Sequence, residues 1–181
     1  MVYVFLADGF EEIEALGTVD ILRRSELEVK TVSINETKEV TGTHGIKVFS
    51  DILLSDVNEF DIEALVLPGG LPGADNLENS KAVTDLVTSA SNSGKIIASI
   101  CAAPKIPGVL GLLAGLKATC YPGFEARLFG AKVSKKRVVC DKNFITAKGA
   151  GVTHEFAIAI AGALKKGVLA KRAVKGMFYK I

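Results

Sequence analysis

One apolar run that ends in a cysteine constrains the fold of this chain more than any other feature. Residues 96–100 are apolar apart from Ser99, and Cys101, two alanines and Pro104 follow directly. Apolar runs of this length are typical of strands that are buried on both faces of a parallel sheet. A proline close behind such a strand fits the first turn of a helix, where its missing N–H costs nothing. The run therefore predicts a buried strand that turns sharply into a helix at Cys101.

Strand-like and helix-like segments alternate along the rest of the chain. Strands are predicted at Val2–Ala7, Leu27–Ser33, Ala64–Pro68 and Ile96–Ile100. Helices are predicted at Glu11–Arg24, at Asn79–Asn92 in one or two pieces, from Ala102 to about Leu113, and at Thr153–Leu164. Short alternating stretches favour a small hairpin or edge strands within Glu36–Asp51, and a late hairpin of Val138–Cys140 with Phe144–Ala147. This alternation predicts one α/β domain over residues 1–181, a doubly wound and mostly parallel sheet with helices on both faces.

Composition excludes several classes of protein. Hydrophobic residues make up 49% and charged residues 23% of the 181 residues, which is globular composition. The 22 basic and 20 acidic side chains leave a net charge of only +2, which argues against nucleic acid or a membrane surface as partner. No segment reaches the roughly 18 apolar residues of a membrane span, and the first residues look like a strand and not a signal peptide. The basic stretch Lys165–Lys180 alternates with apolar residues and predicts a solvated C-terminal helix.

The three cysteines bear on compartment and on metal binding. The chain has three cysteines, Cys101, Cys120 and Cys140, which is an odd number. No C-x-x-C spacing among them suggests a metal site. We therefore expect a reducing cytoplasm, no bound metal and no cofactor. Cys140 lies in an apolar strand and is interpreted as inert packing, whereas Cys120 precedes Tyr121 and could lie near a pocket at Cys101.

Three of the predicted strands end in segments suited to chemistry, namely Ala7-Asp8-Gly9, Pro68-Gly69-Gly70 and Ile100-Cys101-Ala102. In a parallel sheet all three ends face the same edge. A cysteine at a strand-to-helix turn is placed as on a nucleophile elbow, and a helix N-terminus favours its thiolate. The N–H groups of Gly70 and Ala102 could form an oxyanion hole beside the sulfur. A buried structural cysteine and a tight turn at Gly69 and Gly70 are the alternatives.

Glu14 stands out among three acids at the start of the first predicted helix. Glu11 and Glu12 are interpreted as complements of the helix dipole. At about 100° per residue, Glu14 falls at the edge of the apolar arc that is formed by Phe10, Ile13, Gly17 and Ile21. A carboxyl group on a buried face must find a partner or hold a proton, so its pKa should be raised. Glu14 could then donate to a thiolate at Cys101 and shuttle a proton, or could be satisfied by a backbone partner.

Four sequence blocks identify a family resemblance: Ala7–Ala15, Val66–Leu77, Ala98–Pro104 and Gly149–Ala157. Together they resemble the ThiJ/PfpI superfamily, specifically the branch around the parkinsonism-associated deglycase DJ-one. The resemblance runs from about residue 2 to about residue 165. It implies a flavodoxin-like fold, a homodimer, Cys101 as an oxidation-prone nucleophile with Glu14 hydrogen-bonded to its sulfur, and N–H groups from Gly70 and Ala102.

The same resemblance implies several activities. Its branch is credited with glutathione-independent glyoxalase activity, with deglycation of amines and thiols, with sensing of oxidative stress and with chaperone-like behaviour. The leading hypothesis is therefore a cofactor-free enzyme that acts on small reactive aldehydes or on glycated side chains. The alternative is a non-enzymatic redox sensor or redox-regulated chaperone. A protease or amidotransferase is less favoured, because Ala102 stands where the protease branch has histidine.

The chain departs from the family at positions that bear on the site. Tyr121 stands where relatives often carry a histidine before proline, and a phenol is a poor base near pH 7. His44 falls in the predicted edge hairpin and His154 at the start of the last strong helix. Together with Gly69, these three residues could line the pocket, but a surface or capping role is favoured for each histidine.

A homodimer is also expected from the first predicted helix, which is apolar almost all round. Leu16, Val19 and Leu22 lie away from its Phe10–Ile21 face and need cover of their own. The alternative is that a second internal layer covers them.

Overall fold

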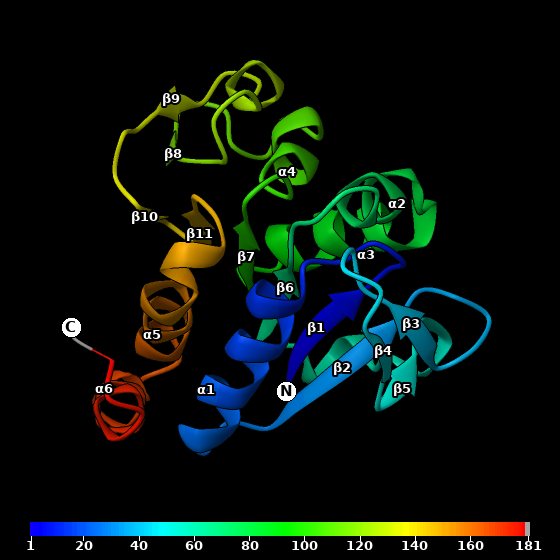
Figure 1. Ribbon diagram of the computed structural model, residues 1–181. Helices are drawn as coiled ribbons and strands as arrows, with labels where there is room; N and C mark the ends of the chain where they lie inside the picture. The colour runs from blue at the N-terminus through cyan, green and yellow to red at the C-terminus, as the bar shows by residue number, and fades with distance from the viewer. Residues whose placement is uncertain (180–181) are drawn as a thin grey trace.

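The structure is a computed structural model in which residues 1–179 are described, and Figure 1 shows its arrangement. A seven-stranded sheet has the order β10-β11-β7-β6-β1-β2-β5. Its strands are β1 (Val2–Leu6), β2 (Val29–Ser33), β5 (Ile52–Leu53), β6 (Ala64–Leu67), β7 (Ile96–Ile100), β10 (Val138–Asp141) and β11 (Phe144–Ala147). All neighbours pair parallel except β10, which is antiparallel to β11.

Helices cover both faces of this sheet, as Figure 1 shows. One face carries α1 (Thr18–Arg24) and α5 (Thr153–Ala163), with α6 (Gly167–Gly176) packed on them. The other face carries α2 (Gly73–Asn79), α3 (Lys81–Asn92) and α4 (Lys105–Val109). Two apolar cores lie between the sheet and these helices. The predicted flavodoxin-like α/β architecture is therefore confirmed, together with the C-terminal helix.

Smaller elements complete the described chain. The hairpin of β3 (Glu39–Thr41) and β4 (Lys47–Phe49) falls where an edge hairpin was predicted. A second two-stranded sheet joins β8 (Lys117–Ala118) to β9 (Lys132–Val133). Short 3₁₀ turns lie at η2 (Leu54–Asp56), η3 (Glu59–Asp61), η4 (Glu125–Arg127) and η5 (Ala150–Val152). The sequence did not predict β8 and β9, because two-residue strands leave no readable periodicity.

The helix after Cys101 is much shorter than predicted. Residues 101–104 form turns, and α4 spans only Lys105–Val109 instead of reaching from Ala102 to about Leu113. Pro107 lies inside this segment and has no N–H to donate, and Gly111 adopts a φ of +73° that ends helical geometry. The two prolines and this glycine therefore limit the helix to five residues.

The first predicted helix also departs from ideal geometry. It begins as a π-helical turn, η1 (Ile13–Gly17), before continuing as α1. The wider turn rotates Ile13 out of the predicted apolar arc, and 57% of its surface is exposed. Val19 and Leu22 pack inside the core against the sheet and α5, so a second internal layer covers them. Because Val19 and Leu22 are buried within the chain, they give no argument for a dimer.

The order of the strands determines where a site can form. From β1, the chain builds the sheet in one direction through β2 and β5 and in the other through β6, β7 and β11. Ligands in such folds bind at the carboxyl ends of the strands beside this reversal. The loops after β1, β6 and β7 meet there. Among the described helices, none is long and apolar enough to cross a membrane.

Candidate active site

Cys101 occupies a sharp turn at the carboxyl end of β7. Its φ of +64° lies in the left-handed region, which non-glycine residues rarely adopt. The backbone on both sides holds it there, because its N–H donates to Ala147 at 2.9 Å and its C=O accepts from Tyr121 at 2.8 Å. The side chain is half-buried. This geometry confirms the elbow that the sequence predicted, and strain of this kind persists only where the surroundings enforce it.

The loop after β6 supplies backbone groups to the sulfur. The backbone N–H groups of Gly70 and Ala102 hydrogen-bond Cys101 and act to lower the pKa of its thiol. Gly70 has a φ of +89°. Gly69 passes so close to Cys101 that a Cβ placed on it would lie 2.5 Å from the Cys101 Cβ. The glycine pair is thus required for close approach, and both predicted oxyanion-hole residues face the sulfur.

Glu14 lies on the π-helical turn and is only 1% exposed. Its Oε2 accepts the Gly69 N–H at 2.8 Å, and the carboxylate also accepts a hydrogen bond from the Cys101 thiol. Burial raises the pKa of Glu14 from 4.5 to about 7, and the charge of Glu11 adds to the effect. The hydrogen bonds from Gly69 and Cys101 act in the opposite direction. The carboxyl group therefore has both the backbone partner and the sulfur partner that the sequence left as alternatives.

The protonation state of Cys101 differs from the prediction. Burial raises the pKa of its thiol to about 12, and the charge of Glu14 and the hydrogen bond to it act in the same direction. The helix N-terminus that was expected to favour a thiolate does not begin until Lys105. The resting group is therefore a thiol that donates to Glu14. A carboxylate with a pKa near 7 is well placed to take this proton.

Glu11 and Glu12 do more than complement a helix dipole. The Glu11 carboxylate accepts the Glu14 N–H at 2.6 Å. Glu12 is buried to 7% exposure and pairs with His44, whose Nδ1 lies 2.7 Å from Oε2 and whose backbone N–H donates to Oε1. This pairing raises the pKa of His44. One potential ligand atom from each of Glu11, Glu12 and His44 lies within 4.8 Å of the others, which is the described cluster that comes nearest to a metal site.

Tyr121 and His154 have different neighbours. A Cβ on Gly149 would lie 3.3 Å from Tyr121 Cδ2 and 3.8 Å from Glu14 Oε1, so Gly149 lies close to both side chains. Gly149 is a neighbour of the site that sequence reasoning did not single out. His154 stacks on Tyr179, with ring centroids 4.0 Å apart. The structure directs His44 to Glu12 and His154 to Tyr179, in agreement with the favoured surface and capping roles.

Sequence reasoning missed a buried ion cluster behind the elbow. Lys105, in the first turn of α4, is 2% exposed and pairs with Asp75 and with Glu78, the latter at 3.2 Å. Its ammonium also lies 5.8 Å from the centre of the Phe124 ring. Arg127 completes the cluster by pairing with Glu78. The cluster joins α4 to α2, which follows the Gly69–Gly70 loop, and a lysine in an otherwise apolar helix was the available signal.

The other two cysteines have different surroundings. Cys120 is buried next to Tyr121, and burial raises the pKa of its thiol to about 11. Cys140 is exposed on the edge strand β10, so its interpretation as inert packing was wrong. In an edge strand such as β10, alternate side chains can face outward even when the run is apolar.

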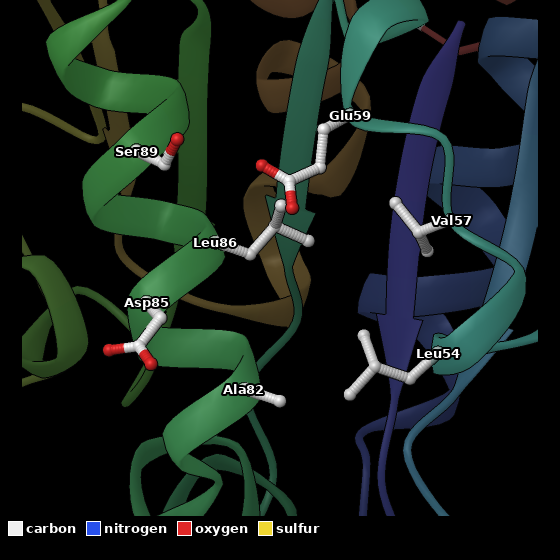
Figure 2. Close-up of a pocket in the computed structure, with 7 residues that line it drawn as sticks. All are labelled: Leu54, Val57, Glu59, Ala82, Asp85, Leu86 and Ser89. Atoms are coloured by element: carbon white, nitrogen blue, oxygen red, sulfur yellow. The ribbon is translucent and has the colours of Figure 1, made fainter.

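A separate cavity of about 340 Å³ lies between α3 and the segment that contains η2 and η3 (Figure 2). Figure 2 shows the side chains of Leu54, Val57 and Leu86 between the two segments, and the Glu59 carboxylate reaching toward α3. Ala82, Asp85 and Ser89 complete the lining. None of these residues belongs to the Cys101 site.

Comparison with known proteins agrees with this geometry. The model of the DJ-1/PfpI family matches residues 1–163. Protein DJ-1 homolog B from Arabidopsis thaliana is 38% identical over 88% of this chain, and the chain spans only 37% of that protein's length. A protein from Pyrococcus abyssi that is named a deglycase is 34% identical, with 83% of this chain and 90% of that protein covered.

Two solved structures are similar over nearly their whole length. One is a cysteine-to-alanine mutant of a DJ-1 superfamily protein from Salmonella typhimurium, with a TM-score of 0.93, 33% identity and coverage of 99% of this chain and 98% of that one. The other is oxidized DJ-1 from Toxoplasma gondii, with a TM-score of 0.93, 34% identity and the same coverage. The fold, the elbow and the family match agree, and the chain belongs to the DJ-1/PfpI family.

Proposed function

We propose that this protein is a cysteine-dependent, cofactor-free enzyme that converts small reactive aldehydes such as methylglyoxal and glyoxal to hydroxy acids without glutathione. The observation that carries the proposal is the buried Glu14 carboxyl group, with a pKa of about 7, hydrogen-bonded to the Cys101 thiol on its elbow. Two backbone N–H groups beside the sulfur add the means to stabilise an oxyanion. The similarity to a named deglycase supports the same substrate class.

The first step is addition of sulfur to the aldehyde carbon. The Glu14 carboxylate accepts the thiol proton as the Cys101 sulfur forms its bond to that carbon. The carbonyl π electrons move to oxygen, where the N–H groups of Gly70 and Ala102 stabilise the charge. Transfer of the proton from Glu14 to this oxygen gives a neutral hemithioacetal and returns Glu14 to its carboxylate form.

An internal redox step then follows without an outside oxidant. Glu14 removes the hydrogen on the former aldehyde carbon as a proton, and the electron pair forms a carbon–carbon double bond while the neighbouring carbonyl oxygen takes the proton of the hemithioacetal hydroxyl, which gives an enediolate. Return of the proton from Glu14 to the neighbouring carbon, as the enediolate oxygen re-forms its carbonyl, gives a thioester of the hydroxy acid with Cys101. Water attacks the thioester carbon, the carbon–sulfur bond breaks, and the hydroxy acid leaves as the thiol regains its proton.

Deglycation is the same chemistry approached from an adduct. Aldehyde adducts of amines and thiols release free aldehyde reversibly, so an enzyme that consumes the aldehyde also depletes the adduct. Glycated side chains are therefore proposed as a second source of substrate, and not as a separate site.

The test is aldehyde consumption by purified Cys101→Ala beside Cys140→Ala as matched control. We expect Cys101→Ala to lose consumption by at least about 10³-fold, because no nucleophile remains, and Cys140→Ala to keep it. Retention of full activity by Cys101→Ala would eliminate the mechanism.

A second candidate function is a redox sensor or redox-regulated chaperone that uses the same sulfur. A half-buried thiol beside a carboxylate can stop at the sulfinic acid, and a similar DJ-1 structure from Toxoplasma gondii is described as oxidized. Peroxide titration with intact-mass detection separates the two functions. Oxidation of Cys101 that changes client binding, with negligible aldehyde turnover, would favour the sensor.

We also propose a homodimer, as the family resemblance implies. The proposal is supported by the exposed apolar side chains of Ile13, Ile46 and Phe49, which are 57%, 54% and 75% exposed on η1 and on the β3–β4 hairpin beside it. Exposed apolar side chains on adjacent elements suit a partner surface. Sedimentation at micromolar concentration should show a dimer, and Phe49→Glu should shift it to monomer.

A further inference from the structure

A second cavity lies at the outer edge of the sheet, where β10 meets the β8–β9 sheet. Its volume is about 330 Å³, and its lining is Lys117, Ser134, Lys136, Val138, Val139 and Cys140. None of these residues belongs to the Cys101 site or to the cavity of Figure 2. Cavities of this size are in the range that holds small ligands.

The charge around this cavity is strongly one-sided. Residues 131–148 contain six basic side chains and one acidic side chain, although the whole chain carries a net charge of only +2. Arg137 pairs with Glu155 at 3.0 Å. In the described part of the chain, no carboxylate forms a salt bridge with Lys117 or with the remaining lysines of this region, which are Lys132, Lys135, Lys136, Lys142 and Lys148.

The pairing of β8 with β9 brings two of these cations together. Lys117 is the register partner of Lys132 in this parallel pair. Like charges directly opposite each other destabilise a sheet unless a counter-charge lies between them. Asp141 lies nearby, and its carboxylate accepts the backbone N–H of Lys117 at 2.8 Å. It is the one acidic side chain of residues 131–148, so a net positive charge remains around the two lysines that line the cavity, Lys117 and Lys136.

We propose that this cavity binds a small phosphorylated molecule, whose phosphate group Lys117 and Lys136 hold. Lysine ammonium groups bind phosphate as point charges, and the Ser134 hydroxyl, which accepts the Lys136 N–H at 3.2 Å, keeps its own proton to donate. Val138 and Val139 offer an apolar wall for the remainder of the ligand. The cavity favours a small ligand over a polymer, because Lys117 and Lys136 line one hollow of limited volume.

Cys140 provides a built-in reporter of occupancy. Its thiol is exposed and lines the cavity, so a bound ligand should shield it from alkylation. Peptide mapping separates its alkylation from that of Cys101 and Cys120. The proposal does not depend on the proposed aldehyde chemistry, because no residue is shared between the two sites.

The experiment measures iodoacetamide alkylation of Cys140 in the full-length protein as inorganic pyrophosphate is added. We expect saturable protection of at least about fivefold at Cys140 and an unchanged rate at Cys101. In Lys117→Gln/Lys136→Gln the pyrophosphate concentration for half-protection should rise about tenfold or more, because the charge-assisted hydrogen bonds are gone. The matched control Lys171→Gln/Lys175→Gln removes the same charge from exposed positions on α6 and should behave as the unaltered chain.

A second alkylating reagent distinguishes specific binding at the cavity from a nonspecific effect of charge. Anionic iodoacetate should alkylate Cys140 faster relative to neutral iodoacetamide in the unaltered chain than in Lys117→Gln/Lys136→Gln, while the ratio at Cys101 stays constant. Sodium chloride at matched ionic strength should not reproduce the protection. Equal protection by sodium chloride, or unchanged protection in the double variant, would overturn the proposal. Tighter binding of a single-stranded oligonucleotide than of pyrophosphate, lost in the double variant, would overturn the assignment to a small ligand.

Discussion

Cys101 at the end of β7 and Cys140 on β10 are thiols of one sheet, and burial raises the pKa of both. Around Cys101 the chain places a buried carboxyl group, two backbone N–H groups and a strained turn, while the ion cluster of Lys105 joins α4 to α2. Around Cys140 it places exposed lysines and no described hydrogen-bond acceptor for the sulfur. A cysteine is therefore suited to catalysis where neighbouring groups can accept and return the proton of its thiol. Exposure and nearby positive charge alone give at most a binding surface.

The largest expected effect comes from removing the carboxyl group. Glu14→Ala should lower aldehyde consumption by about 10²- to 10⁴-fold, because the group that accepts and returns protons is lost. Glu14→Gln should lower it similarly while preserving the acceptor for the Gly69 N–H.

The alkylation rates of Cys101 and Cys140 can be compared in the same Glu14→Gln variant. Glu14→Gln should speed iodoacetamide alkylation of Cys101 at pH 8, since the charge that raises the pKa of its thiol is gone. Cys140 should react at an unchanged rate. Slower alkylation of Cys101 in Glu14→Gln would contradict the electrostatic relation between these groups.

Close packing around Cys101 predicts that a larger residue at position 69 lowers activity. In Gly69→Ala the new Cβ would lie 2.5 Å from the Cys101 Cβ and 2.6 Å from Glu14 Oε2, so one of these groups must move. We expect a loss of about 10²-fold in aldehyde consumption, as displacements of about 1 Å can cause. Gly111→Ala is the control, because Gly111 has a φ of +73° but no atom within 4 Å of a new Cβ. It should cost about 1 kcal/mol of stability and leave activity intact.

Replacement of Lys105, near Cys101, should change stability more than replacement of Lys136, near Cys140. Lys105→Met should lower the free energy of unfolding by about 1 to 2 kcal/mol, because Asp75 and Glu78 lose an ion-pair partner, although Asp75 is half exposed and Glu78 keeps Arg127. Lys136→Met removes an exposed lysine and should change stability by no more than about 0.5 kcal/mol. Urea unfolding of the two variants measures the difference. Similar values would show that the buried cluster contributes little.

The last prediction concerns the pH dependence of stability. Because the pKa of Glu14 is raised from 4.5 to about 7 on folding, the folded chain keeps a proton that the unfolded chain has released between these pH values. This contribution is fully present below pH 4.5 and is lost as pH rises through 7, by about 3 kcal/mol in total. Glu14→Gln should remove that slope. Denaturant unfolding at several pH values measures the stability of the unaltered chain and of Glu14→Gln. The same dependence of stability on pH in both proteins would show that Glu14 keeps an ordinary pKa.

The sequence predicted the architecture well where signals are local. The apolar run before Cys101 and the glycines after β6 are visible within a few residues, and each lies where it was expected. The burial of Glu14 was predicted from helical periodicity and its contact with Cys101 from the family resemblance, whereas the π-helical turn placed Ile13 in solvent. The exposure of Cys140 was missed, because an apolar strand at an edge resembles a buried one until its neighbours are known.

The sequence alone determined the doubly wound fold and the turn that carries Cys101, since apolar periodicity, glycine and proline act through adjacent residues. The tertiary structure decided the protonation of the Glu14–Cys101 pair, the burial of Lys105 and the gathering of lysines at β8, β9 and β10. These depend on contacts across long stretches of chain, such as the 55 residues between Glu14 and Gly69. A pKa is determined by burial and by neighbouring charges, and both exist only after distant segments have packed together.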